Sequence, residues 1–124
     1  MRAVSRVRSF TCAPSSVTAA RMFVREALSD KPAEMVEAIE LMTSELATNC
    51  VRHAASDFEV LLSIDGKVTV EVRDHGEQHP QVAEKRGLSP SGHGLRIVDG
   101  IADEWGTSRS DGGNTVWFTL APPV

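Results

Sequence analysis

The sequence predicts a two-layer α/β sandwich, in which helices cover one face of a mixed, mostly antiparallel sheet. Two stretches, 67–73 and 115–120, predict this class because apolar and polar residues alternate along each of them. The residues on their apolar sides are Val68, Val70, Val72, Val116, Phe118 and Leu120. A strand with a single apolar side belongs to a sheet that is covered on one face only, so we expect the helices to lie together on that face.

The size and charge of the chain limit its function. Its 124 residues, 41% of them apolar, suffice for one compact core, and no repeat or linker divides them, so we expect a single domain over residues 1–124. The net charge of −4 argues against direct nucleic-acid binding, which needs a basic surface. No cleavable signal and no apolar run near the ~20 residues of a membrane span occur, so we expect a cytoplasmic protein with no membrane contact. Cys12 and Cys50 should stay reduced there, and a disulfide between them is the less favoured alternative.

The first elements are a strand and a helix. The stretch Arg2–Phe10 predicts an edge strand, although its alternation is imperfect and it carries three arginines. Pro14–Leu28 has the spacing of a helix. We expect the buried side of this helix to be formed by Val17, Arg21 or Met22, Val24 and Leu28.

A longer helix follows, and its apolar stripe contains a carboxamide. Asp30 as N-cap and Pro32 in the first turn begin this helix, which runs to about His53. At about 100° per residue, Asn49 lies on the side that also carries Met35, Ile39, Met42, Leu46 and His53. Glu45 lies one turn earlier, at the rim of the same side. A buried amide without hydrogen bonds costs about 1 to 3 kcal/mol, so we expect a polar partner to face it, namely a nucleotide and its metal.

A hairpin comes next, and a carboxylate ends it. Phe58–Ile64 and Lys67–Arg73 are the predicted strands, and Asp65 with Gly66 forms the tight turn between them. Asp74 continues the apolar parity of the second strand, so it points toward the helical layer. There it either accepts backbone N–H bonds in the turn or binds the exocyclic amine of adenine. In the second case Gly76 lets the backbone approach the ring closely.

The stretch His75–Ser91 has no periodicity, and we interpret it as a lid loop. A helix with two glycines at its start follows, and the free N–H groups at such a start attract phosphate, although Gly-His-Gly alone is more often a turn. The residues on the apolar side of this helix are Leu95, Val98 and Ile101. Lys85 and Arg86 either reach the γ-phosphate from the lid or form a solvated charge pair.

The residues present argue against three other kinds of site. The histidines are scattered over a helix and a loop, without the HExxH or cysteine pairs of a zinc site. They are His53, His75, His79 and His93. Ser91 has no recognisable base and orienting acid, which argues against a hydrolase triad. The glycine-rich stretch lacks the Gly-Lys-Ser or Gly-Lys-Thr of a P-loop.

Three motifs in this order, Glu45-x-x-x-Asn49, Asp74-x-Gly76 and Gly92-x-Gly94-Leu95, resemble the GHKL ATP-binding superfamily and its Bergerat fold. Within it, the chain looks most like the stand-alone anti-sigma-factor serine kinases and related regulatory ATP-binding proteins of actinobacteria. The stretches that carry this closer resemblance are 44–54, 91–99, 102–106 and 112–118.

The resemblance implies a role for each motif. Asn49 would hold Mg²⁺ that bridges the phosphates of ATP, and Glu45 would be the base that accepts a proton from a substrate hydroxyl. Asp74 would bind adenine. The phosphates would be held by the amides around Gly92, His93, Gly94 and Leu95. Phosphoryl transfer is chiefly positioning and charge neutralisation, so a metal ligand and a carboxylate on adjacent helical turns are chemically sufficient.

Two residues depart from the pattern of the resemblance. Gln78 replaces a second glycine, which stiffens the expected lid hinge, and Asn114 stands where related kinases often carry lysine, which removes a cation near the nucleotide. The expected function is an ATP-dependent serine/threonine kinase that phosphorylates an anti-sigma-factor antagonist and sequesters a sigma factor. The alternative is a non-catalytic, ATP-gated module that binds a partner protein. The resemblance also implies a homodimer.

Overall fold

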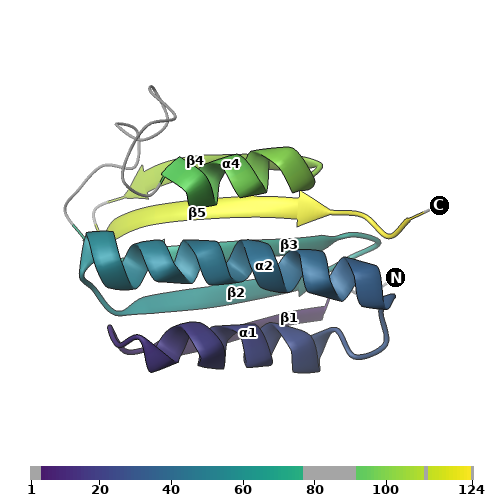
Figure 1. Cartoon of the computed structure of the whole chain (residues 1–124), viewed down its shortest axis with the longest axis horizontal. Coiled ribbons are helices and arrows are strands. Elements are labelled where there is room, and N and C mark those ends of the chain that lie inside the picture. The colour runs from purple at the N-terminus through teal and green to yellow at the C-terminus, as the bar shows by residue number, and fades with distance from the viewer. Residues whose placement is uncertain (1–3, 77–91, 111, 124) are drawn as a thin grey trace.

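Residues 4–76, 92–110 and 112–123 are described in the computed structural model, which has one layer of helices and one of strands (Figure 1). The first half of the chain contains β1 (Val4–Phe10), α1 (Ser15–Ala27), α2 (Ala33–Asn49) and a π-helical turn, η1 (Cys50–Ala54). The elements that follow are β2 (Phe58–Ile64), β3 (Val68–Asp74), α4 (Gly92–Ile101), β4 (Glu104–Ser110) and β5 (Gly113–Leu120).

The sheet has five strands in the order β1-β2-β3-β5-β4. All four pairs of neighbouring strands are antiparallel, so the two-layer sandwich is confirmed and the sheet is antiparallel throughout rather than mixed. After β3 the chain passes through α4 to the outer strand β4 and returns between them as β5. The end of β3 is thereby paired with the start of β5, with Asp74 opposite Asn114.

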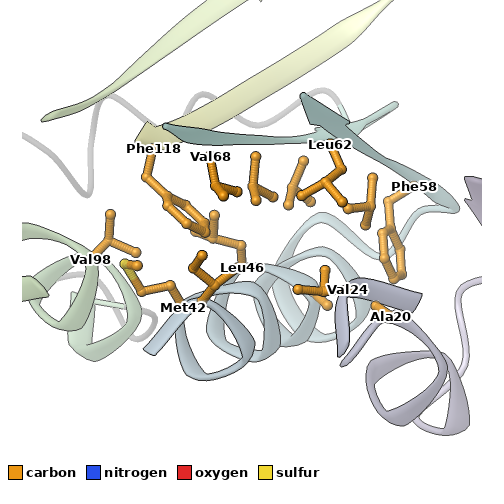
Figure 2. Packing of buried hydrophobic residues seen from close by; sticks show 14 of the residues in the cluster. Ala20, Val24, Met42, Leu46, Phe58, Leu62, Val68, Val98 and Phe118 are labelled. Atoms are coloured by element: carbon orange, nitrogen blue, oxygen red, sulfur yellow. The ribbon is translucent and has the colours of Figure 1, made fainter. Parts of the chain in front are cut away.

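The core lies between the sheet and the helices α1, α2 and α4, which lie side by side on one face of the sheet (Figure 1). The predicted alternation of β3 is confirmed, because Val68, Val70 and Val72 are all buried. Figure 2 shows how residues of the helical layer meet the sheet, with Leu46 near Phe118 and Val24 near Phe58. Burial of these apolar side chains is the main favourable contribution to such a fold.

The predicted buried side of α1 is confirmed at Val24 and Leu28 but not at its earlier positions, where Val17 is only partly buried. The observed buried side is formed at strict four-residue intervals by Ser16, Ala20, Val24 and Leu28. Met22 is 40% exposed, and Arg21 points across to Glu40 of α2 at 3.8 Å. A small residue at position 20 lets the helix lie close to the sheet, which periodicity alone does not indicate.

Two local predictions are wrong in detail. Pro32 is itself the N-cap of α2, with a non-helical ψ of 141°, so Asp30 lies outside the helix and no side chain caps it. The turn of the first hairpin has three residues, because Ile64 pairs with Val68 and the amide of Asp65 donates to the carbonyl of Lys67 at 2.9 Å. Only Gly66 in this turn has a positive φ, of 75°.

Other sequence expectations concern the thiols and the membrane. Cys12 and Cys50 are both free, the first exposed and the second buried. In the part of the chain that the structure describes, no helix is long and apolar enough to cross a membrane.

Candidate functional site

Glu45 and Asn49 lie on adjacent turns at the end of α2, and Asn49 is its last residue. Both are half-buried, so they lie at the edge of the apolar stripe rather than within it. The neighbouring hydroxyls of Ser44 and Thr48 bond back to helix carbonyls at 2.8 and 2.7 Å. Among the described residues, by contrast, the side chains of Glu45 and Asn49 have no hydrogen-bond or ion-pair partner, which leaves them available to a ligand.

A second glutamate on the same helix has a structural role. Glu40 is buried, and its two oxygens accept hydrogen bonds from Nε and Nη2 of Arg25 at 3.1 and 2.7 Å. These bonds, and then the negative charge of Glu40, raise the pKa of the Arg25 guanidinium above its ordinary value. The bidentate pair fastens α1 to α2. The structure therefore distinguishes Glu40, which is paired with Arg25, from Glu45.

The helix continues beyond Asn49 in π geometry, whereas the sequence predicted one helix to about His53. This turn, η1, ends at Ala55 with a φ of 50°, and the amide of Ser56 donates to the carbonyl of Cys50 at 3.3 Å. π-helical turns are rare and occur frequently at functional sites. Here the wider turn begins directly after the candidate metal ligand.

The π-helical turn meets the segment after β3. Gly76 is buried, and a Cβ on it would lie 3.0 Å from the Cβ of Ala54. Close by, the amide of His75 donates to the hydroxyl of Ser56 at 3.0 Å. Gly76 is thus a point of close approach, as expected, but the observed neighbour is the helix end.

Asp74 ends β3 and is half-buried on the side that the parity predicted. Its Oδ1 accepts hydrogen bonds from the amide of Gly76 at 2.8 Å and from Nδ2 of Asn114 at 3.3 Å. Within the described part of the chain, Oδ2 accepts none. The turn-stabilising role is therefore observed, and the second oxygen is left for a ligand, so adenine binding by Asp74 stays a prediction.

Asn114 is a site residue that the sequence analysis missed. It lies opposite Asp74 in the β3–β5 register, is 3% exposed, and its Nδ2 also lies 3.2 Å from the carbonyl oxygen of Gly76. The sequence analysis treated it only as a missing cation. Extending the parity of Val116 and Phe118 back by one step would have placed its side chain toward the helical layer.

The start of β5 packs closely against the end of β3. Gly113 has a φ of 141°, which side chains rarely adopt, and a Cβ on it would overlap the carbonyl oxygen of Asp74. This glycine is required by both its conformation and the space around it. It sets the position of Asn114 relative to Asp74.

The pKa of the Cys50 thiol in the helical layer is influenced by a charge at the end of the sheet. Burial, then the negative charge of Asp74, and then Cys12 raise the pKa of Cys50 far above its ordinary value. Cys50 directly follows Asn49, so the charge of Asp74 acts on the end of α2. At this edge of the molecule, the charge of a residue in the sheet therefore acts on the end of the helical layer.

The start of α4 lies at the same edge. α4 ends at Ile101, shortly before β4 begins at Glu104 opposite Thr119, near the far end of β5. α4 therefore runs antiparallel to α2, as Figure 1 also shows, and Figure 2 places Val98 beside Met42. The N-terminus of α4, at Gly92, therefore lies near the end of α2.

The remaining candidate residues are placed as follows. Leu95 is 7% exposed and packs in the core, so only its main chain is available to phosphate. Gly92, His93 and Gly94 begin α4. The expected lid, with Gln78, Lys85 and Arg86, lies outside the described residues. A separate cavity of about 270 Å³, lined in part by Phe10, Phe58 and His75, includes neither Asn49 nor Asp74.

The comparisons with known proteins agree on one domain type. Residues 10–120 match the histidine kinase-like ATPase domain. A comparison with curated proteins gave no match.

Solved structures are similar over most of the chain. The RsbU and RsbW domains of Rv1364c from Mycobacterium tuberculosis match with a TM-score of 0.74 and 19% identity, over 96% of this chain and 32% of that one. The blue-light activated histidine kinase EL346 of Erythrobacter litoralis matches with a TM-score of 0.62 and 25% identity, over 75% of this chain and 32% of that one. The histidine kinase domain of that protein matches with a TM-score of 0.61 and 20% identity, over 90% of this chain and 61% of that one. The chain therefore spans less than two thirds of each.

Proposed function

The chain belongs to the histidine kinase-like ATPase domain family, and from this premise we propose that it is an ATP-binding anti-sigma factor with serine/threonine kinase activity. Its substrate is an anti-sigma-factor antagonist, and its second partner is a sigma factor. The likeness to a structure that contains an RsbW domain supports this class of partner, together with the motif resemblance. We also propose that it acts in the cytoplasm, as a homodimer, without contacting nucleic acid.

The observation that carries the proposal is the pair of unpartnered polar groups at the end of α2. Glu45 and Asn49 are half-buried, lie one turn apart and have no partner among the described residues. Desolvating a carboxylate and a carboxamide is unfavourable unless something polar binds them. A phosphorylated ligand with its metal ion satisfies both groups.

The residues present fit Mg²⁺ and ATP chemically. The carboxamide oxygen of Asn49 is a hard ligand of the kind that Mg²⁺ prefers, and Mg²⁺ carried on phosphates needs few protein ligands. The ion supplies neutralisation of phosphate charge. The N–H groups at the start of α4 bind phosphate oxygens, and Oδ2 of Asp74 accepts from the adenine amine.

Glu45 is the proposed catalytic base. Its carboxylate accepts the proton of the substrate hydroxyl and orients the oxygen toward the terminal phosphoryl group. General-base catalysis of this kind contributes about 10² to 10⁴-fold. Glu40 cannot serve instead, because both of its oxygens are bound by Arg25.

The test is phosphoryl transfer from radiolabelled ATP with Mg²⁺ to an antagonist encoded beside the gene. We expect the wild type to label it and Glu45→Gln to lose at least about 100-fold in rate while still binding ATP. Glu37→Gln, an exposed position on the same helix, is the matched control and should keep the rate. ATP binding without any label would favour the non-catalytic binding module, and absence of ATP binding would overturn both functions.

A further inference from the structure

We propose that Asn114 determines which nucleotide base the site accepts, because it holds Asp74 as a pure hydrogen-bond acceptor. The inference rests on the proposed ATP site and assigns its base specificity to a residue that does not itself need to touch the base. Asn114 is thus a positioning residue that acts through Asp74.

The contacts around Asn114 carry this inference. Its Nδ2 lies 3.3 Å from Oδ1 of Asp74 and 3.2 Å from the carbonyl oxygen of Gly76. An amide nitrogen has two protons and can donate to both oxygens. Because both neighbours are acceptors, the carboxamide must present its nitrogen here and not its oxygen. The side chain is almost fully buried, at 3% exposure, so water does not readily replace these bonds.

As a consequence, the two carboxylate oxygens of Asp74 have different roles. Oδ1 receives two donors, the amide of Gly76 and Nδ2 of Asn114, whereas Oδ2 accepts no hydrogen bond among the described residues. The carboxylate is therefore fixed in orientation, with one acceptor directed to a ligand. Such an acceptor selects a base that offers a donor, as the exocyclic amine of adenine does. Guanine offers a carbonyl at that position, and two facing acceptors repel.

Asn114 suits this task better than the residues that could replace it in a strand. A leucine of similar volume has no donor, so Asp74 would keep only the bond from Gly76. A carboxylate would bring a second negative charge against Asp74. A threonine keeps one donor and fits a strand well. These differences define the variants.

The first test measures the affinities of ATP and GTP by calorimetry in Mg²⁺. We expect the wild type to prefer ATP and Asn114→Leu to lose at least about tenfold of that preference, with GTP affinity little changed. Asp74→Asn should lose the preference for ATP over GTP completely and so sets the lower limit. Asn114→Thr, which keeps one donor, should retain the preference to within about threefold of wild type. A folded Asn114→Leu protein with the wild-type preference overturns the inference, because a merely structural residue would alter both affinities together.

The second test uses the wild type and does not depend on any variant folding. The chain has only two asparagines, Asn49 and Asn114. Labelling with ¹⁵N-asparagine therefore gives two side-chain amide signals, assigned with Asn114→Thr. We expect adenosine to shift the signal of Asn114 and Mg²⁺ with tripolyphosphate to shift that of Asn49. If the wild type binds ATP but adenosine leaves the Asn114 signal unchanged, this inference alone is refuted, whereas a wild type that binds no nucleotide refutes the proposed function.

Discussion

Gly76 lies directly against Ala54, and this contact joins the turn after β3 to the π-helical turn after Asn49. A Cβ on Gly76 would lie 3.0 Å from the Cβ of Ala54 and 3.1 Å from its carbonyl oxygen. On the other side, Nδ2 of Asn114 in β5 donates a hydrogen bond to the carbonyl oxygen of Gly76. The proposed adenine end and the proposed metal end of the site therefore share one rigid contact.

Replacing Gly76 with alanine should separate the two ends. We expect Gly76→Ala to lower the free energy of unfolding by about 1 to 3 kcal/mol, as overpacking does, and to weaken ATP binding. Ala54→Gly in the same chain should recover part of both losses. Gly100→Ala is the control, because a Cβ there meets nothing within 4 Å. Additive effects of the two substitutions in a double-mutant cycle would show that the contact does not couple them.

Asn49→Ala should abolish Mg²⁺-dependent ATP binding and leave the fold intact. The side chain is half-buried and has no hydrogen-bond partner among the described residues, so its loss breaks no observed hydrogen bond. Calorimetry with and without Mg²⁺ measures the effect, and circular dichroism monitors the fold. An affinity unchanged in Mg²⁺ would falsify the metal role.

Glu40 and Glu45 of α2 should respond differently to the same substitution. Glu40→Gln removes the charge that the Arg25 guanidinium pairs with, so we expect a melting temperature lower by several degrees. Glu45→Gln removes no observed contact and should leave the melting temperature close to that of the wild type. Thermal unfolding of both variants checks this. A larger loss in Glu45→Gln would mean that Glu45 holds the fold together.

Adjacent glycines at the start of β5 should differ sharply. Gly113→Ala places a Cβ on the carbonyl of Asp74 at a φ of 141°, so we expect a loss of at least about 2 kcal/mol in unfolding free energy. Gly112→Ala meets nothing within 4 Å and should stay within about 0.5 kcal/mol of wild type. Denaturant unfolding measures both. Equal effects would contradict the close packing of β5 on Asp74.

The two thiols should differ in reactivity. Burial and the charge of Asp74 raise the pKa of Cys50, so its reactive thiolate is scarce at neutral pH, whereas Cys12 is exposed. We expect dithiobis(nitrobenzoate) to label one thiol in the folded protein and both after unfolding, and none in folded Cys12→Ser. Because the folded pKa of Cys50 exceeds the unfolded one, its contribution to stability is present below about pH 8.5 and is lost as pH rises. Rapid labelling of Cys50 in the folded state would contradict its burial.

The sequence was sufficient for features that depend on local periodicity. The alternation of Val68, Val70 and Val72 predicted both the strand and the side of Asp74, because successive residues of a strand face opposite sides. The three motifs around Asn49, Asp74 and Gly92 indicated the family. Each of these features lies within a short stretch of neighbouring residues, so it can be detected without knowing what lies across the fold.

The sequence by itself determined the layers and the family, and it supplied the candidate residues for ATP binding. Only the tertiary structure decided that Glu40 pairs with Arg25 whereas Glu45 has no partner among the described residues, that Gly76 packs on Ala54, and that Asn114 bonds Asp74. Each of these facts depends on a neighbour that is distant in the chain, and the pairing of β3 with β5 across an inserted helix and strand sets the register. A hydrogen bond or close contact requires placement within a few tenths of an ångström, and that placement comes from packing, not from the order of residues.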